Sequence, residues 1–279
     1  MNIGAVLRES STLLQAVTDV PRLEAEVLLT HVTGLPRTAL LAHPERPLPT
    51  DRWAAYEARV RRRAAGYPLP YLIGRVEFYG LEFAVTPDVL IPRPETERLV
   101  EMARARRPGV IVDVGTGSGC VAVALAVHLP GAQVYATDLS GPALRVAAAN
   151  ARRHGVEDRV RLIQGDLVGP LTGPIDLVVS NPPYVAEGEW AFLPESVRQH
   201  EPRLALDGGA DGLAVIRRLL TDVPRLLRPG GVLLVEIGAT QREAAAALAH
   251  SLLPEARVAV HPDLAGRDRV LEIEFQVEA

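Results

Sequence analysis

The sequence predicts an α/β protein in which a parallel sheet follows a smaller helical region. Beyond residue 90, apolar segments of strand length alternate with amphipathic segments of helical period, as in strands joined by right-handed crossover helices. The first 65 or so residues repeat apolar side chains at helical spacing only. A chain of 279 residues is long for one domain, so a large domain with a smaller companion is expected.

The N-terminal region is predicted to be a small bundle of short helices. Prolines separate its apolar runs, and proline ends helices because it lacks an N–H group and has a fixed φ. Three arginines, Arg61, Arg62 and Arg63, fall at the end of the last run. They form either a solvated face that complements the helix dipole or a docking patch for a partner.

A change of pattern after Gly66 indicates a linker. Apolar residues alternate on both sides of Gly80, as in a β-hairpin. We therefore divide the chain into a helical domain (residues 1–70), a β-hairpin linker (71–90) and an α/β domain (91–279). In the last of these, strands are predicted at 110–114, 133–137, 160–164, 175–180, 232–236 and 270–275, and helices at 121–128, 142–153, 213–227 and 242–253.

Composition narrows the class of protein. The net charge of −4 argues against a protein held on nucleic acid mainly by phosphate contacts. No apolar stretch approaches the roughly 18 residues that span a bilayer, and no secretory signal is recognisable at the N-terminus, so we expect a cytoplasmic protein. The single cysteine, Cys120, gives no zinc-ligand spacing and no internal disulfide, and we expect no metal.

A glycine-rich loop joins a predicted strand to a predicted helix. Gly115, Gly117 and Gly119 follow the apolar strand, and such glycines let a ligand approach the backbone at a helix N-terminus. The spacing is G-x-G-x-G and not the G-x-G-x-x-G of dinucleotide sites, and Asp113 precedes it. An acid here can face the ammonium group of an amino-acid moiety, which S-adenosylmethionine has and NAD lacks.

Two further acids end the next two strands. Asp138 lies 25 residues after Asp113, where a doubly wound sheet presents a carboxylate to ribose hydroxyls. Asp166 is placed to accept a hydrogen bond from an adenine amino group, with Leu167 packed against the ring. Singly, Asp138 or Asp166 could be a helix cap, but the set together with the glycine loop favours a nucleoside site.

The fourth strand runs into the tetrapeptide Asn181-Pro182-Pro183-Tyr184. Two prolines can simply stop a strand. They also fix the backbone, so that the Pro182 carbonyl and the Asn181 side chain can offer two convergent acceptors to a planar –NH2 group, with Tyr184 packed against its face. Such acceptors would raise electron density on an amide nitrogen whose lone pair is delocalised, and no strong base would be required.

With these motifs the sequence resembles the bacterial release factor glutamine methyltransferases, also called HemK-type or protein-(glutamine-N5) methyltransferases, along nearly its whole length. The resemblance is carried by the segments RLEAEVLLTHVTGLPRTAL, PLPYLIGRVEFYGLEFAVTPDVLIPRPETERLVE, DVGTGSGCVAVALA, ATDLS, SNPPYV, HEPRLALDGGADGL and AGRDRV. It implies a Rossmann-like seven-stranded domain, S-adenosylmethionine as methyl donor, and the Gly-Gly-Gln loop of class I peptide chain release factors as substrate.

The resemblance also assigns roles to residues. Asn181 to Tyr184, with Pro182 and Pro183, would hold the glutamine, and Pro92 to Thr96 would cover the methionine end of the cofactor or begin a helix. The helical domain would help to grip the release factor, which makes Arg37 and the arginine run contact candidates. We expect a monomer. The implied cofactor contacts are Gly115, Thr116, Gly117, Ser118, Gly119, Asp138, Asp166 or Leu167, and Asn181.

Other targets share many of these motifs. A glutamine methyltransferase acting on a ribosomal protein would carry nearly all of them. An adenine-N6 nucleic-acid methyltransferase carries a similar tetrapeptide, but it would need a base-flipping surface that an acidic chain with 4% aromatic residues does not suggest. A non-catalytic S-adenosylmethionine-binding module is disfavoured by the intact tetrapeptide.

Overall fold

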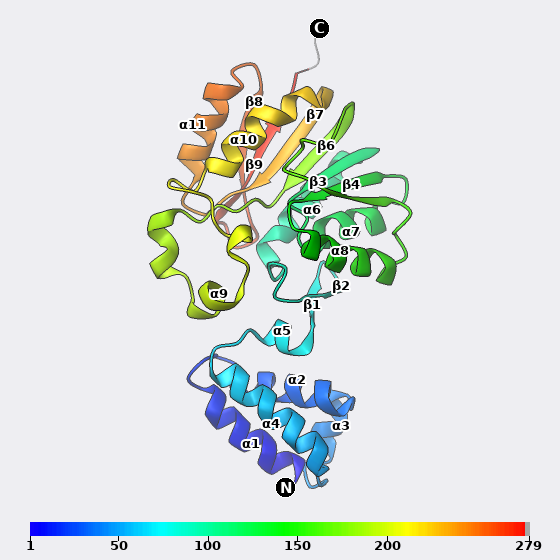
Figure 1. Cartoon of the computed structure of the whole chain (residues 1–279), viewed down its shortest axis with the longest axis vertical. Helices are drawn as coiled ribbons and strands as arrows, with labels where there is room; N and C mark the ends of the chain where they lie inside the picture. The colour runs from blue at the N-terminus through cyan, green and yellow to red at the C-terminus, as the bar shows by residue number, and fades with distance from the viewer. Residues whose placement is uncertain (277–279) are drawn as a thin grey trace. The chain divides into compact units, whose positions relative to one another are not determined.

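The computed structural model describes residues 1–276, which divide into two compact units (Figure 1). One comprises Met1–Arg75 together with Pro194–His200, and the other comprises Val76–Leu193 and the residues from Glu201 onward. Among residues 1–276, no helix combines the length and apolar character needed to cross a bilayer.

The first unit is helical, and a small apolar core holds it together. Leu7, Leu28 and Tyr56 are fully buried in it, and the Tyr56 hydroxyl donates to the Ala25 carbonyl at 3.2 Å. Pro21 is the first residue of its helix, where a missing N–H group costs nothing. The helices are α1 (Ile3–Leu14), α2 (Pro21–Thr33), α3 (Arg37–Ala42), α4 (Thr50–Ala64), α5 (Leu69–Ile73) and α9 (Glu195–His200).

The three arginines at the end of α4 have different surroundings. Arg63 lies 2.6 Å from the Glu24 carboxylate, and both side chains are only 11% exposed, so this pair is part of the packing between helices. The Arg62 guanidinium stacks 4.0 Å above the Tyr67 ring. Arg61 pairs with Glu57 at the surface and is 74% exposed. Arg37, the other contact candidate, pairs with Glu26 at 2.6 Å.

A β-hairpin is formed by β1 (Arg75–Phe78) and β2 (Leu81–Ala84), and all of it except Arg75 belongs to the second unit. Its two turn residues, Tyr79 and Gly80, both have positive φ, 52° and 72°, as a tight type I′ turn requires. Phe78 and Phe83 are buried in the core beneath the sheet. The hairpin is therefore anchored by its aromatic side chains.

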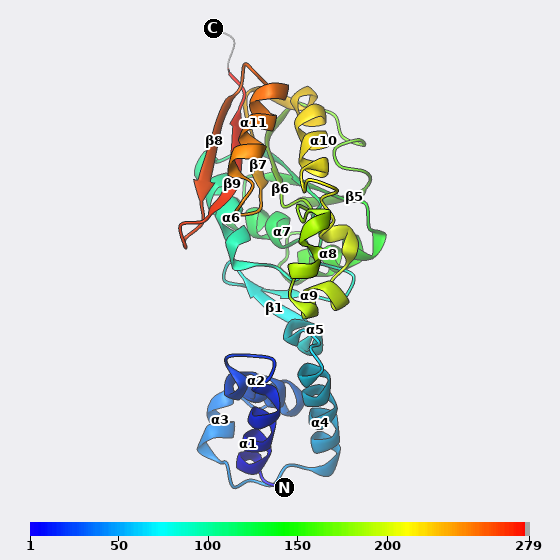
Figure 2. The same ribbon diagram turned by 90° about the vertical axis from the view of Figure 1, so that its left-hand side faces the viewer.

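The main sheet has seven strands in the order β5-β4-β3-β6-β7-β9-β8. Strands β5, β4, β3, β6 and β7 pair in parallel, and β8 runs in the same direction, but β9 is antiparallel to both β7 and β8. The α/β fold with seven strands is confirmed, but the sheet predicted to be parallel is mixed at this edge, where β8 and β9 lie side by side (Figure 2). The strands are β3 (Val110–Val114), β4 (Gln133–Asp138), β5 (Val160–Gln164), β6 (Ile175–Ser180), β7 (Leu227–Glu236), β8 (Arg257–Pro262) and β9 (Asp268–Glu274).

Helices cover both faces of the sheet, with α6, α7 and α8 on one face and α10 and α11 on the other (Figure 1). Neighbouring strand residues enter opposite cores: Ile111 faces α7, whereas Val112 faces α10. The α-helices are α6 (Glu97–Arg106), α7 (Cys120–His128), α8 (Gly141–Arg153), α10 (Ala214–Asp222) and α11 (Arg242–Leu252), and the 3-10 turns are η1 (Pro94–Thr96), η2 (Glu187–Phe192), η3 (Arg203–Ala205) and η4 (Val223–Arg225).

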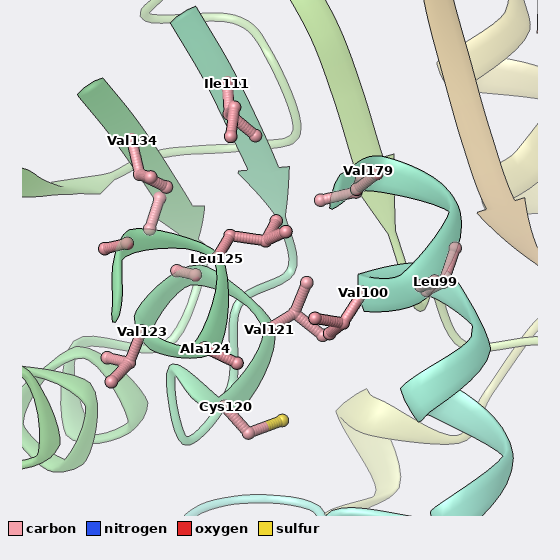
Figure 3. Packing of buried hydrophobic residues seen from close by; sticks show 14 of the residues in the cluster. Leu99, Val100, Ile111, Cys120, Val121, Val123, Ala124, Leu125, Val134 and Val179 are labelled. Carbon is pink, nitrogen blue, oxygen red and sulfur yellow. The ribbon is translucent and has the colours of Figure 1, made fainter. Parts of the chain in front are cut away.

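Helix α7 is the best-buried helix of this unit. Figure 3 shows Val121 of α7 beside Val100 of α6, and Leu125 beneath the sheet. Because α7 is packed on all sides, its N-terminus and the glycine loop before it have a fixed position.

Candidate active site

A pocket opens at the carboxyl ends of β3, β4 and β6, the edge where parallel α/β sheets bind ligands. Most of the site residues predicted from the sequence line it, whereas Gly119, Pro182 and Tyr184 are not among its lining residues. The predicted residues that line it are Asp113, Gly115, Thr116, Gly117, Ser118, Asp138, Asp166, Leu167, Asn181 and Pro183.

The glycine loop contributes to the pocket mainly through its backbone conformation, since two of its N–H groups are already used in hydrogen bonds within the protein. Gly115, Gly117 and Gly119 have φ of 71°, 56° and 79°, a region that side chains with a Cβ rarely adopt. The N–H groups of Gly115 and Thr116 already donate to the Thr137 carbonyl. A Cβ on Gly119 would lie 3.0 Å from that of Ala147 in α8, so this glycine lets two helices approach.

Asp113 is a buried carboxylate at the end of β3. Its Oδ2 accepts hydrogen bonds from the Thr116 hydroxyl at 2.7 Å and from the Ala122 N–H at 3.1 Å. Burial raises the pKa of Asp113 to about 6, against the lowering effect of these bonds. An ammonium group in the pocket would restore the charged form.

Asp138 ends β4 and is fixed through both of its oxygens. Oδ2 accepts from the Gly117 N–H and Oδ1 from the Ser140 N–H, each at 2.8 Å. Burial raises the pKa of this carboxyl group above its usual range. Each oxygen retains a lone pair, so the pair can receive two neighbouring hydroxyl donors.

Asp166 and Leu167 form the outer wall of the pocket. The Asp166 carboxylate pairs at 2.6 Å with Arg218 of α10, a residue that also lines the pocket and that the sequence did not single out. Both side chains are more than half exposed. Leu167 has a φ of 48°, so the chain turns sharply there.

The tetrapeptide after β6 is held at both ends. Asn181 lines the pocket, and its Nδ2 donates to the Thr96 hydroxyl at 3.1 Å. The Tyr184 hydroxyl donates to Oε1 of Glu236 at 3.3 Å, and the Tyr184 carbonyl accepts from Gln241 at 3.0 Å. Burial and the Glu236 carboxylate raise the pKa of Tyr184. Tyr184 is thus turned toward the protein interior.

Glu236 is a functional candidate that sequence reasoning missed. It ends β7, the neighbour of β6, and is buried at 1% exposure. Its Oε2 accepts from the Thr96 hydroxyl at 2.7 Å. The available signal was the one that selected Asp113 and Asp138: an acid at the carboxyl end of a strand.

Two features that the sequence left without a role act on the pocket wall. The buried Glu201 carboxylate accepts from the Ile91 N–H at 3.2 Å and from Arg93 at 2.5 Å. It therefore ties the segment before η1 to the segment that includes Pro202. Gly208 lies against the backbone of Tyr184, where a Cβ would come within 2.8 Å of the Tyr184 Cα.

Cys120, the first residue of α7, also borders the pocket. It is 9% exposed, and burial raises the pKa of its thiol to about 12. The thiol is therefore protonated at neutral pH and is a poor nucleophile.

Comparison with known proteins agrees with this geometry. Residues 5–74 match the family described as PrmC N-terminal domain, and residues 94–209 match the family described as Methyltransferase small domain. A solved methyltransferase from Pyrococcus furiosus shares the fold, with a TM-score of 0.56 and 20% identity over 80% of this chain and 98% of that chain.

The curated relatives are closer. The release factor glutamine methyltransferase of Moorella thermoacetica is 50% identical over 254 residues, which cover 89% of each chain. The protein of the same name from Nitratidesulfovibrio vulgaris is 43% identical over 277 residues, 96% of this chain and 94% of its own. This chain therefore belongs to the release factor glutamine methyltransferase family.

Proposed function

We propose that this enzyme transfers a methyl group from S-adenosylmethionine to the side-chain amide nitrogen (N5) of the glutamine in the Gly-Gly-Gln motif of class I peptide chain release factors. The observation that carries the proposal is the position of Asn181. Its amide lies in the same pocket as the glycine loop, and its Nδ2 is committed to Thr96. The carbonyl oxygen Oδ1 is therefore the atom left for a substrate.

The residues on the nucleoside side fit S-adenosylmethionine. Asp113 suits the ammonium group of the methionine part, because the Thr116 hydroxyl and the Ala122 N–H both donate to the same oxygen, Oδ2. Asp138 suits the two ribose hydroxyls, and Asp166 or Leu167 the adenine. When bound, this cofactor supplies a methyl group on a positively charged sulfur.

The tetrapeptide suits a planar –NH2 group. Asn181 Oδ1 and the Pro182 carbonyl would each accept one N–H of the glutamine amide, and Pro183 would border it. These bonds increase electron density on nitrogen and favour its passage toward tetrahedral geometry. They also fix the nitrogen in line with the methyl group, which reduces the entropic barrier.

The direct test is incubation with labelled S-adenosylmethionine and a purified release factor, followed by mass spectrometry of the Gly-Gly-Gln peptide. We expect one methyl group on the glutamine and no label in a release factor whose glutamine is replaced by alanine. Label on a ribosomal protein, or on adenine in a nucleic acid, with none on the release factor would contradict the proposal.

The Asn181→Ala variant tests the role of the tetrapeptide. By analogy with the loss of one donor from an oxyanion hole, we expect single-turnover methyl transfer to fall about 100- to 1000-fold. Binding of S-adenosylhomocysteine, measured by calorimetry, should stay within about twofold, because the nucleoside contacts lie on β3, β4 and the loop after β5. An unchanged rate of transfer would refute the assignment.

The helical unit is the proposed grip for the release factor. Arg61 is a better candidate for contacts than Arg63, because its side chain is 74% exposed whereas that of Arg63 is 11% exposed against Glu24. We further propose that the enzyme acts as a cytoplasmic monomer on a protein substrate, without direct contact with nucleic acid.

A further inference from the structure

Three side chains from distant parts of the sequence form one hydrogen-bonded chain behind the tetrapeptide. Asn181 Nδ2 donates to Thr96 Oγ1 at 3.1 Å, and Thr96 Oγ1 donates to Glu236 Oε2 at 2.7 Å. Tyr184 donates to the other carboxylate oxygen at 3.3 Å. Glu236 is thus linked to both ends of the tetrapeptide: directly to Tyr184, and to Asn181 by way of the Thr96 hydroxyl.

The direction of these bonds follows from the single proton of the Thr96 hydroxyl. While Glu236 is ionised it can only accept, so Thr96 must donate to it. The threonine oxygen is then an acceptor toward Asn181, and only the –NH2 side of the Asn181 amide can satisfy it. The carbonyl side of that amide is consequently left for the pocket.

We propose that Glu236 is a positioning residue for methyl transfer: its negative charge, relayed by the Thr96 hydroxyl, fixes the Asn181 amide with its oxygen toward the substrate nitrogen. The inference rests on the proposed function of Asn181 and deepens it. Glu236 touches neither the substrate nor the cofactor in this scheme, and it acts through the two side chains that bind it.

Protonation of Glu236 at Oε2 would reverse the chain. The new O–H group donates to Thr96 Oγ1, and the Thr96 hydroxyl then donates a hydrogen bond to Asn181 Oδ1, which requires the amide to rotate by about 180°. Every buried donor keeps an acceptor, because Tyr184 still donates to Oε1. Asn181 would now present –NH2 to the –NH2 of the glutamine, and the acceptor for methyl transfer would be lost.

The surroundings of Glu236 raise the pKa of its carboxyl group into the neutral range, so that this protonation can occur near pH 7. The pKa of Glu236 is raised to about 7, with burial as the largest cause and the Glu95 carboxylate adding to it. Arg269 of β9 and the bonds from Thr96 and Tyr184 act in the opposite direction. The Cys120 thiol, on α7, also faces this carboxylate, and Arg93 faces Tyr184.

The test is the pH dependence of single-turnover methyl transfer to a purified release factor at saturating S-adenosylmethionine. Because the active form is ionised, the wild-type rate should fall about tenfold per pH unit below an apparent pKa near 7. Glu236→Gln cannot ionise, so its rate should lack this limb. Thr96→Val keeps the shape but breaks the relay, so its rate should fall about tenfold at pH 8 and also lose the limb.

Two comparisons make the outcome decisive. Glu95→Gln removes a neighbouring carboxylate that is outside the relay, so it should keep the limb and move it to lower pH. Burial also raises the pKa of Asp113, but at saturating S-adenosylmethionine the ammonium group of the cofactor keeps this carboxylate ionised, so Asp113 should add no limb near pH 7 in any variant. A limb near pH 7 that persists in Glu236→Gln or Thr96→Val would overturn the relay. An Asn181→Ala variant with full activity would instead overturn the proposed function.

Discussion

At Gly208 the absence of a side chain lets two loops meet behind the pocket. The Val185 N–H donates to the Leu206 carbonyl and the Gly208 N–H to the Val185 carbonyl, both at 2.9 Å. A Cβ at Gly208 would stand 2.8 Å from both the Cα and the carbonyl carbon of Tyr184. Gly208 therefore determines how closely its own loop can pack against the backbone of Tyr184 in the tetrapeptide.

The Gly208→Ala variant should lower the free energy of unfolding by about 1–3 kcal/mol, the usual cost of overpacking. It should also slow methyl transfer, because the added carbon pushes on Tyr184. Gly188→Ala is the matched control, since a Cβ there meets nothing within 4 Å. Denaturant unfolding and single-turnover rates check this, and equal stability of the two variants would contradict it.

Site residues could be predicted where a local sequence pattern, such as a polar residue at the end of an apolar strand, marks them. Asp138 and Asn181 each follow an apolar strand directly, and both line the pocket. Glu236 also ends a strand, but what makes it notable is a bond to Thr96, 140 residues away in the sequence. No local pattern shows such a partner, nor the pairing of Asp166 with Arg218.

At the scale of elements, α7 has no polar face. Each residue from Cys120 to Ala126 is buried, because α6, α8 and the sheet surround the helix. The helix carries the glycine loop at its start, so its packing determines the position of the cofactor side of the pocket.

Leu125→Ala should lower the free energy of unfolding by about 2–5 kcal/mol, the range for a leucine truncated in a close-packed core. Leu125 is fully buried, whereas Leu252 at the end of α11 is 40% exposed. Leu252→Ala should therefore cost much less. Guanidinium unfolding followed by circular dichroism measures both free energies of unfolding. Similar decreases in the two variants would contradict the prediction that α7 is the more tightly packed helix.

Elements with a clear apolar period were predictable, and those determined by context were not. Strand β8 has no fully buried residue, so its pattern is weak and it was not anticipated. Helix α10 was predicted to reach residue 227 but ends at Asp222, because Pro224 follows. Strand β7 begins at Leu227, whereas its predicted start was residue 232, so it includes Pro229, Gly230 and Gly231.

On the scale of the whole molecule, the helical unit exposes basic side chains to which the reaction assigns no role. Arg61 is 74% exposed, compared with 55% for Arg37 and 11% for Arg63. An exposed charge of this kind steers a partner more than it stabilises the fold.

Arg61→Glu should raise KM for an intact release factor by about three- to tenfold with little change in kcat. A short Gly-Gly-Gln peptide should be methylated equally well by both enzymes, because it lacks the rest of the release factor that the helical unit is proposed to bind. Arg46→Glu reverses another exposed charge of that unit and should have no effect. Steady-state kinetics with both substrates check the prediction, and an equal loss on the peptide would contradict it.

The assignment of residues 194–200 to the helical unit was beyond sequence reasoning. These residues lie far along the chain, between two parts of the sheet domain, and nothing in their composition marks them as belonging elsewhere. Which unit a short segment joins depends on long-range contacts that a one-dimensional pattern does not encode.

The burial of the single thiol makes this chain well suited to fluorescent labelling. Cys120 is the only cysteine, and its thiol is protonated and largely covered, so maleimide dyes should leave it unmodified under native conditions. A cysteine introduced at position 61 would then carry a dye alone. Its emission could follow the arrival and departure of a release factor in real time, without first removing a native attachment point.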